Sequence, residues 1–147
     1  MDNNSEMLFK EIDLIQGCIG RMSKNSFMLK GWALTIFAGV IAVTKASLLN
    51  DLVVLSCCIF VPLCCFWILD AFFLHTEKKY RKMYEWVLKN RKEGNLDFQF
   101  DLNPQRFSND AGCYFRTLFS ITLAVFYAIP LLMILIILLF NVISSHI

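Results

Sequence analysis

Hydrophobic residues along the chain gather in three long blocks, over residues 28–49, 52–74 and 118–143. Each residue of a helix rises about 1.5 Å, so roughly 20 apolar residues cross the hydrocarbon core of a bilayer. The blocks therefore predict an all-α membrane protein with three transmembrane helices. Asn50 and Asp51 form a very short link, so we expect the first two spans to make a helical hairpin.

The residues before the first block predict an amphipathic helix. Asn3 followed by Glu6 is a weak capping-box variant. Apolar residues then recur at alternating steps of four and three, at Leu8, Ile12, Ile15, Ile19 and Met22. This a/d seam either packs on the membrane surface or on the chain's own bundle, or else it joins copies of the chain.

Most of the charge lies between the second and third blocks, in residues 75–117. Residues 75–90 are expected to continue the second span as a helix, with Glu77–Arg81 and Glu85–Lys89 pairs four residues apart, and Gly94-Asn95 is expected to end it. Residues 96–102 then alternate strictly between apolar and polar, which predicts a short strand. That strand would pair with its equivalent in a neighbouring subunit; otherwise the segment lies extended over the helices.

Lysine and arginine predict the orientation, because they are enriched in cytoplasmic loops. The predicted parts are a cytoplasmic N-terminal helix (1–27), a transmembrane hairpin (28–74), a cytoplasmic basic segment (75–117), and a third span with a short external tail (118–147). Both the N-terminus and the basic segment are thus expected inside the cell, and the C-terminus outside.

The basic segment has two interpretations. Its positive residues either serve only topology and contact with anionic lipid, or they bind a nucleotide or oligonucleotide together with interleaved aromatic rings. The candidate ligand-binding residues are Lys78, Lys79, Arg81, Lys82, Lys89, Arg91, Lys92 and Arg106.

Asp70 interrupts an otherwise apolar run, and a carboxylate there is costly unless it is paired or faces water. We predict an ion pair or hydrogen bond with Lys30, or with Asn25 or Ser26, that fixes the register of the hairpin. The alternative is a ring of Asp70 residues at the mouth of a pore.

Two further polar residues lie within the apolar blocks. Lys45, near the end of the first block, is expected to snorkel outward, to face an aqueous cavity or to pair with Asp51. Asn141 is one of the few polar groups in the third block.

Catalytic and metal-binding patterns are lacking. The six cysteines include no Cys-x-x-Cys, and neither His75 nor His146 completes a metal-ligand spacing. No cofactor and no enzymatic activity are expected.

Several runs carry a resemblance: 21–27 into Lys30-Gly31-Trp32, then 66–74, 77–84, Asp97-Phe98 and 120–127. They resemble small bacterial membrane effectors of antiphage defence operons, of the Hailong or retron type. The match covers nearly the whole chain, but its motifs are structural rather than catalytic.

The resemblance implies an ion channel of the bacterial inner membrane, built as a cyclic homo-oligomer with a tetramer favoured. Opening would depolarise the membrane and arrest the infected cell, under control of a nucleotide or oligonucleotide signal from an operon-encoded partner. The competing hypothesis is a membrane anchor or adaptor subunit that conducts no ions and docks a soluble partner through residues 75–117.

Overall fold

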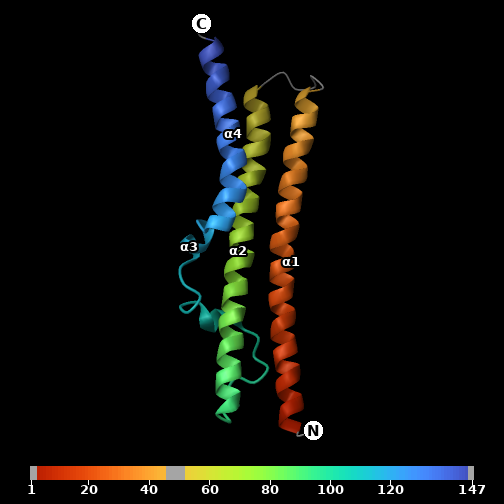
Figure 1. The fold of residues 1–147 in the computed structure, drawn as a ribbon, viewed down its shortest axis with the longest axis vertical. Helices are drawn as coiled ribbons and strands as arrows, with labels where there is room; N and C mark the ends of the chain where they lie inside the picture. The colour runs from red at the N-terminus through yellow and green to blue at the C-terminus, as the bar shows by residue number, and fades with distance from the viewer. Residues whose placement is uncertain (1–2, 46–51, 146–147) are drawn as a thin grey trace.

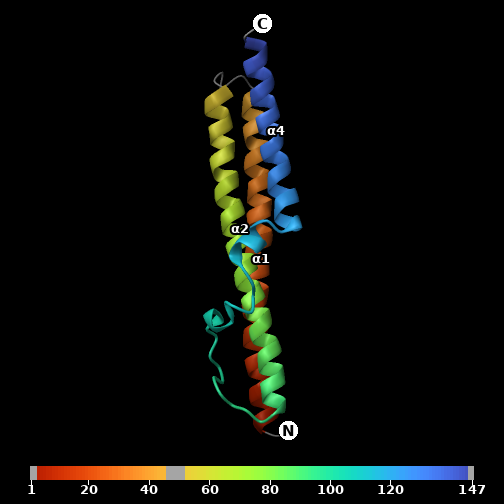
Figure 2. The ribbon, with the colours of Figure 1, turned by 90° about the vertical axis from the view of Figure 1, so that its left-hand side faces the viewer.

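A computed structural model describes the backbone of residues 3–45 and 52–145. It contains two long helices, α1 (Asn3–Lys45) and α2 (Leu52–Lys92), followed by a 3-10 turn, η1 (Pro104–Phe107), a short helix, α3 (Tyr114–Leu118), and α4 (Ile121–Ser145). Helices α1 and α2 run antiparallel, side by side, over most of the length of the molecule. Helix α4 packs along the half of α2 that lies farther from the N-terminus (Figures 1 and 2).

The seam predicted in the first helix packs within the chain. Ile15 and Ile19 of α1 are buried against Met83 and Val87 of α2, with Phe107 of η1 closing this cluster. The seam is therefore used for packing on the chain's own bundle, as the first of its two interpretations proposed. It is not left open for contact between copies.

A second apolar cluster joins α1, α2 and α4 in the other half of the molecule. Its buried members are Ala33, Ile59, Leu63, Ala71, Leu123, Tyr127 and Ile134. Alanines on α1 and α2 let the two backbones approach closely. The two clusters lie at different heights along one pair of helices, so the fold is a long rod rather than a body with a single central core.

The prediction of three transmembrane spans is wrong. Among the described helices, only α2, over Cys58–Lys92, is long and apolar enough to cross a membrane. In the third block the helix breaks between Leu118 and Ile121, and the part of α4 whose side chains are described without a gap, Ile121–Ile136, is shorter than a span. The first block does not qualify over its described residues, and the predicted turn at Asn50–Asp51 lies outside them.

The predicted strand is also wrong. Residues 96–102 form turns, with Gln99 N–H donating to Leu96 O and Asp101 N–H to Phe98 O. Phe98 (φ 55°) and Phe100 (φ 59°) have left-handed backbone conformations, which break the extended alternation that a strand needs. The part of the chain with assigned structure offers no second strand, so the backbone groups are satisfied by local turns instead.

The helix predicted after the second block is confirmed. Helix α2 continues without interruption from the apolar block through His75 to Lys92. Gly94 then adopts φ 77°, and Asn95 N–H returns to Asn90 O, so a left-handed glycine ends the helix as the sequence predicted. Helix α1 likewise passes without a break through the predicted boundary at residue 27.

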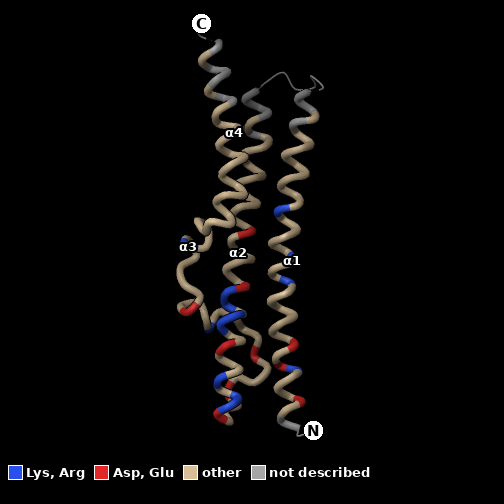
Figure 3. Tube along the Cα trace, in the orientation of Figure 1, with Lys and Arg blue, Asp and Glu red and all other residues tan. Residues whose placement is uncertain are grey.

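Charge is segregated along this rod. Figure 3 shows the acidic and basic residues gathered toward the end that holds the N-terminus. In the other half, over residues 31–45, 52–69 and 121–145, Lys45 is the only charged residue. Two continuous helices thus join a charged half to an apolar half.

Candidate functional site

A buried polar cluster lies where the charged half meets the apolar half. The Asp70 side chain on α2 is fully buried. Ser26 Oγ and Lys30 Nζ, both on α1, donate hydrogen bonds to its two carboxylate oxygens, and Tyr127 OH on α4 donates a third, with a length of 3.1 Å. One carboxylate therefore connects the three principal helices.

The ion pair predicted between Asp70 and Lys30 is present, and Ser26, named as an alternative partner, contributes as well. Lys30 Nζ also donates to Ser26 Oγ over 2.9 Å, one turn away on α1. Tyr127 was not predicted as a partner. The sequence feature that could have indicated it is a tyrosine in an otherwise apolar helix, since a buried tyrosine hydroxyl usually finds a hydrogen-bond partner.

This cluster suits a structural role, in which it holds three helices together, better than it suits a cation-binding role. The carboxylate charge is balanced by Lys30, and each donor comes from a residue of the chain itself. Because Asp70 is fully buried, it presents no carboxylate oxygen to solvent. The side chains of Lys45 and Asn141 lie outside those that the structure describes, so their roles stay predictions.

A second buried ion pair lies in the charged half, between Glu11 of α1 and Arg91 of α2. The two side chains are 2% and 4% exposed. Arg91 Nε and Nη2 donate to the two carboxylate oxygens over 2.9 and 2.8 Å, the paired geometry that suits guanidinium and carboxylate. This pair fixes the charged ends of α1 and α2 against each other.

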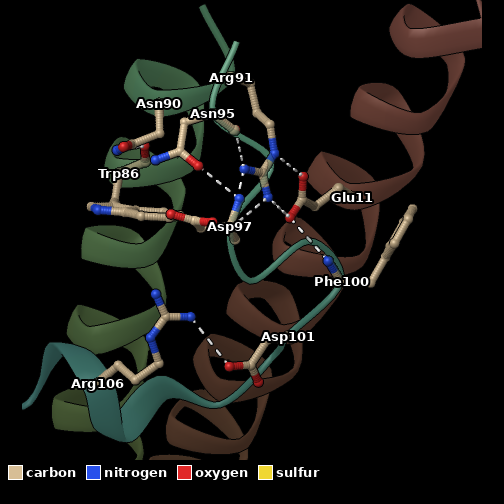
Figure 4. Close-up of polar contacts among 9 residues, drawn as sticks. All are labelled: Glu11, Trp86, Asn90, Arg91, Asn95, Asp97, Phe100, Asp101 and Arg106. Carbon is tan, nitrogen blue, oxygen red and sulfur yellow. Dashed lines mark hydrogen bonds and ion pairs between the residues drawn. The ribbon is translucent and has the colours of Figure 1, made fainter. Parts of the chain in front are cut away.

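The same pair holds the segment that follows α2. Arg91 also donates to Asn95 O and Asp97 O, and Glu11 accepts from the backbone N–H of Phe100 over 3.1 Å (Figure 4). These contacts fasten both sides of the turn in which Phe98 and Phe100 adopt positive φ. The unusual backbone is therefore supported by buried charge.

Arg106 makes further contacts with the segment that follows α2. Its guanidinium carbon lies 3.5 Å from the centre of the Phe98 ring and 5.2 Å from that of Trp86, and it donates to Asp101 over 3.2 Å. Cation–π contacts of this kind stabilise a folded loop when the cation is partly shielded from water. Arg106 thus contributes to the packing of residues 96–107.

The eight basic residues predicted to bind a nucleotide lie on α2 and η1, and the nucleotide site itself stays a prediction. Several are engaged within the chain: Lys78 with Thr117, Lys79 with Gln105, Arg81 with Glu77, Lys82 with Glu85, Arg91 with Glu11 and Arg106 with Asp101. Lys89 and Lys92 have no hydrogen bond or ion pair within the described residues. The expected Glu77–Arg81 pair is present, whereas Glu85 pairs with Lys82 instead of Lys89.

Helix α3 is fastened to α2 by two side chains. Trp67 Nε1–H donates to Leu118 O and Tyr114 OH donates to Ile68 O, each over 2.9 Å. His75 is buried beside the Tyr114 ring, and its Nδ1 has no hydrogen-bond partner within the described residues. The described part of the chain holds no group of three or more His, Cys, Asp or Glu side chains suited to a metal ion.

Two buried ion pairs thus hold the helices together: Asp70–Lys30, with Tyr127, joins α1, α2 and α4, and Glu11–Arg91 joins α1 and α2. No protein-family model, curated protein or solved structure matches this chain.

Proposed function

We propose that this chain is a membrane-anchored subunit: its apolar half lies in a bilayer, and its charged half projects into the cytoplasm to dock a soluble partner. The observation that carries the proposal is the segregation of exposed side chains along two continuous helices. Exposed large apolar residues run along the whole of one half, which is almost without charge. The other half holds nearly all the charge and fewer such residues, among them Phe9 and Phe98.

The exposed apolar surface is too extensive for a water-facing rod. Outward-facing residues of the apolar half include Trp32, Leu34, Phe60, Val61, Ile68, Ile121, Ile129 and Ile136. Exposed apolar surface costs about 25 cal/mol per Å² in water, and soluble monomers rarely expose large contiguous patches. Helix α2, which has the length and composition of a membrane span, is the element expected to cross the bilayer.

The charged half has the features of a docking platform. It is held rigid by the buried Glu11–Arg91 pair and by the seam around Ile15 and Met83. Lys89 and Lys92 leave their ammonium groups without a partner inside the described chain. A rigid body with unpaired cations on its surface suits contact with an acidic soluble partner.

Alkaline carbonate washing of membranes from cells that express the full chain tests the anchoring. We expect the protein to remain in the membrane pellet, as an integral protein does. Release of most of the protein into the wash would overturn the proposal. A tag at the N-terminus should be digested by protease only when the cytoplasmic side of the membrane is accessible.

A second candidate function is the homo-oligomeric ion channel of a defence system that the family resemblance implies. The observation that favours it is the exposed apolar face of α4, which leaves room for further copies to pack. The buried, paired state of Asp70 weighs against a pore ring of that residue.

Membrane potential separates the two functions. We would measure the fluorescence of a potential-sensitive dye in cells that express the chain alone and in cells that express it together with its operon neighbour. Unchanged potential in both supports the anchor, and depolarisation that depends on the neighbour supports the channel.

A further inference from the structure

A buried histidine lies where α3 packs against α2 (Figure 1). The His75 ring on α2 is buried and meets the Tyr114 ring of α3 edge to face, with 5.7 Å between the two centroids. Its Nδ1 atom has no hydrogen-bond partner within the described residues. A buried polar atom without a partner is costly, whether the imidazole nitrogen is a donor or an acceptor. The packing of α3 over His75 therefore depends on the state of this ring.

The charges around the ring are positive. Lys78 and Lys79 follow one turn later on α2, and among the described residues theirs are the charges that act on the imidazole. From α3, the titratable group that faces the ring is the Tyr114 phenol, whose hydroxyl already donates to Ile68 O. Burial first, and then the two lysines, lower the pKa of His75. The site thus favours a neutral imidazole.

Helix α3 is held to α2 by few contacts. It is five residues long, and its attachments lie on both sides of His75 along α2. Trp67 and Tyr114 make the two hydrogen bonds on the apolar side, and on the charged side Lys78 Nζ donates to Thr117 Oγ1 over 3.0 Å. A short element with so few attachments opens at a low cost in free energy. A modest change at the contact can therefore release it.

We propose that His75 is an acid-sensitive switch for α3: the neutral imidazole lets α3 pack over it, and protonation of the imidazole releases α3 from α2. A protonated ring beneath α3 has a buried N–H without an acceptor and lies beside two like charges, whereas a released ring is hydrated. Packing of α3 is then favoured above the ordinary histidine pKa of about 6.5 and weakens as the pH falls below it.

The switch acts on the connection between the two halves of the molecule. The chain passes through α3 on its way from η1 to α4, so release of α3 loosens the link between the charged half and α4. The proposal goes beyond the anchor function and does not depend on it, because every contact that it uses lies within one chain.

Hydrogen exchange of the full chain in detergent micelles tests the switch. Amide protection over residues 113–120 is compared at pH 8 and pH 5, after correction for the intrinsic exchange rate at each pH. If the packed ring stays neutral throughout, a released pKa of about 6.5 makes opening roughly 30-fold more favourable at pH 5 than at pH 8. We expect protection there to fall by at least about threefold within that limit, and protection over residues 80–90 to stay constant.

Variants of the two histidines in the chain separate a titrating role from a merely structural one. His75→Phe keeps an aromatic ring but takes up no proton, so protection over residues 113–120 should no longer depend on pH. His75→Gln, which is polar and does not titrate, should give the same result and covers the case in which phenylalanine disturbs the packing. The matched control, His146→Phe, should keep the pH response of the unchanged protein.

Three results would overturn the proposal. They are a pH response that is absent from the unchanged protein, one that persists in the His75 variants, and one that disappears in His146→Phe. Parallel loss of protection over residues 80–90 would also overturn it, because acid would then unfold the chain rather than release α3. Carbonate washing reports separately on anchoring, so failure of one idea does not disguise failure of the other.

Discussion

The buried pair between Glu11 and Arg91 makes the sharpest prediction about stability. In Glu11→Gln the side chain keeps its size but loses its charge, and one carboxylate oxygen becomes an amide that faces the Arg91 donors. The guanidinium is then left buried without a counter-charge, at 4% exposure, and Phe100 N–H can lose its acceptor.

The expected cost is large because so little of the pair reaches water. Breaking a buried ion pair by removing one partner costs about 3–5 kcal/mol, and the low exposure of both side chains gives no reason to reduce that range. The matched control is Glu6→Gln, in an exposed pair with Lys10 (58% and 67% exposed) four residues away on the same helix. It should cost no more than about 0.5 kcal/mol.

Chemical unfolding of the full chain in detergent, followed by far-ultraviolet circular dichroism, measures both changes. Hydrogen exchange should show in addition that amide protection over residues 96–101 is lost in Glu11→Gln and kept in Glu6→Gln. A cost below about 1 kcal/mol with unchanged protection would refute the reasoning, because it would mean that the pair does not hold the segment.

Three further outcomes are expected. Asp70→Asn should lower the free energy of unfolding by about 2–4 kcal/mol. This is somewhat less than a fully enclosed pair would lose, because the Lys30 side chain is a quarter exposed. Adding Lys30→Met should recover part of the loss, and no recovery would contradict the pairing. Gly94→Ala should cost about 1 kcal/mol by the same unfolding measurement, because φ is 77° there. Burial raises the pKa of Tyr114, so the folded state holds the phenol proton more tightly than the unfolded state does. The free energy of unfolding should therefore fall as the pH rises above about 10. Tyr114→Phe should remove that part of the pH dependence.

The charged part of α2 and its end could be predicted from the sequence, because periodicity and glycine act locally. The helix from His75 onward and its end before Gly94 follow from such signals. The Asp70–Lys30 pair could also be predicted, since a lone carboxylate in an apolar run needs a nearby cation and the hairpin brings only a few within reach. Tyr127 was missed because the approach of α4 to Asp70 depends on how that helix packs.

The errors arose where a pattern has more than one structural outcome. Alternation over residues 96–102 fits a strand, but a strand needs a partner, and the buried Glu11–Arg91 pair fastens this segment as turns instead. The ligand site of the basic residues stays a prediction, but two of their partners are distant in sequence: Glu11 is 80 residues from Arg91 and Thr117 is 39 residues from Lys78. Only the packing of the helices brings those groups together.

The central claim is that the apolar half lies in lipid and the charged half does not. Quenching of tryptophan fluorescence by brominated phosphatidylcholine tests it directly, in full-length proteins that keep one tryptophan each. Trp32, 58% exposed in the apolar half, should be strongly quenched, and Trp86, against Phe107 in the charged half, should be quenched little. Equal quenching of the two, or no quenching of Trp32, would contradict the account.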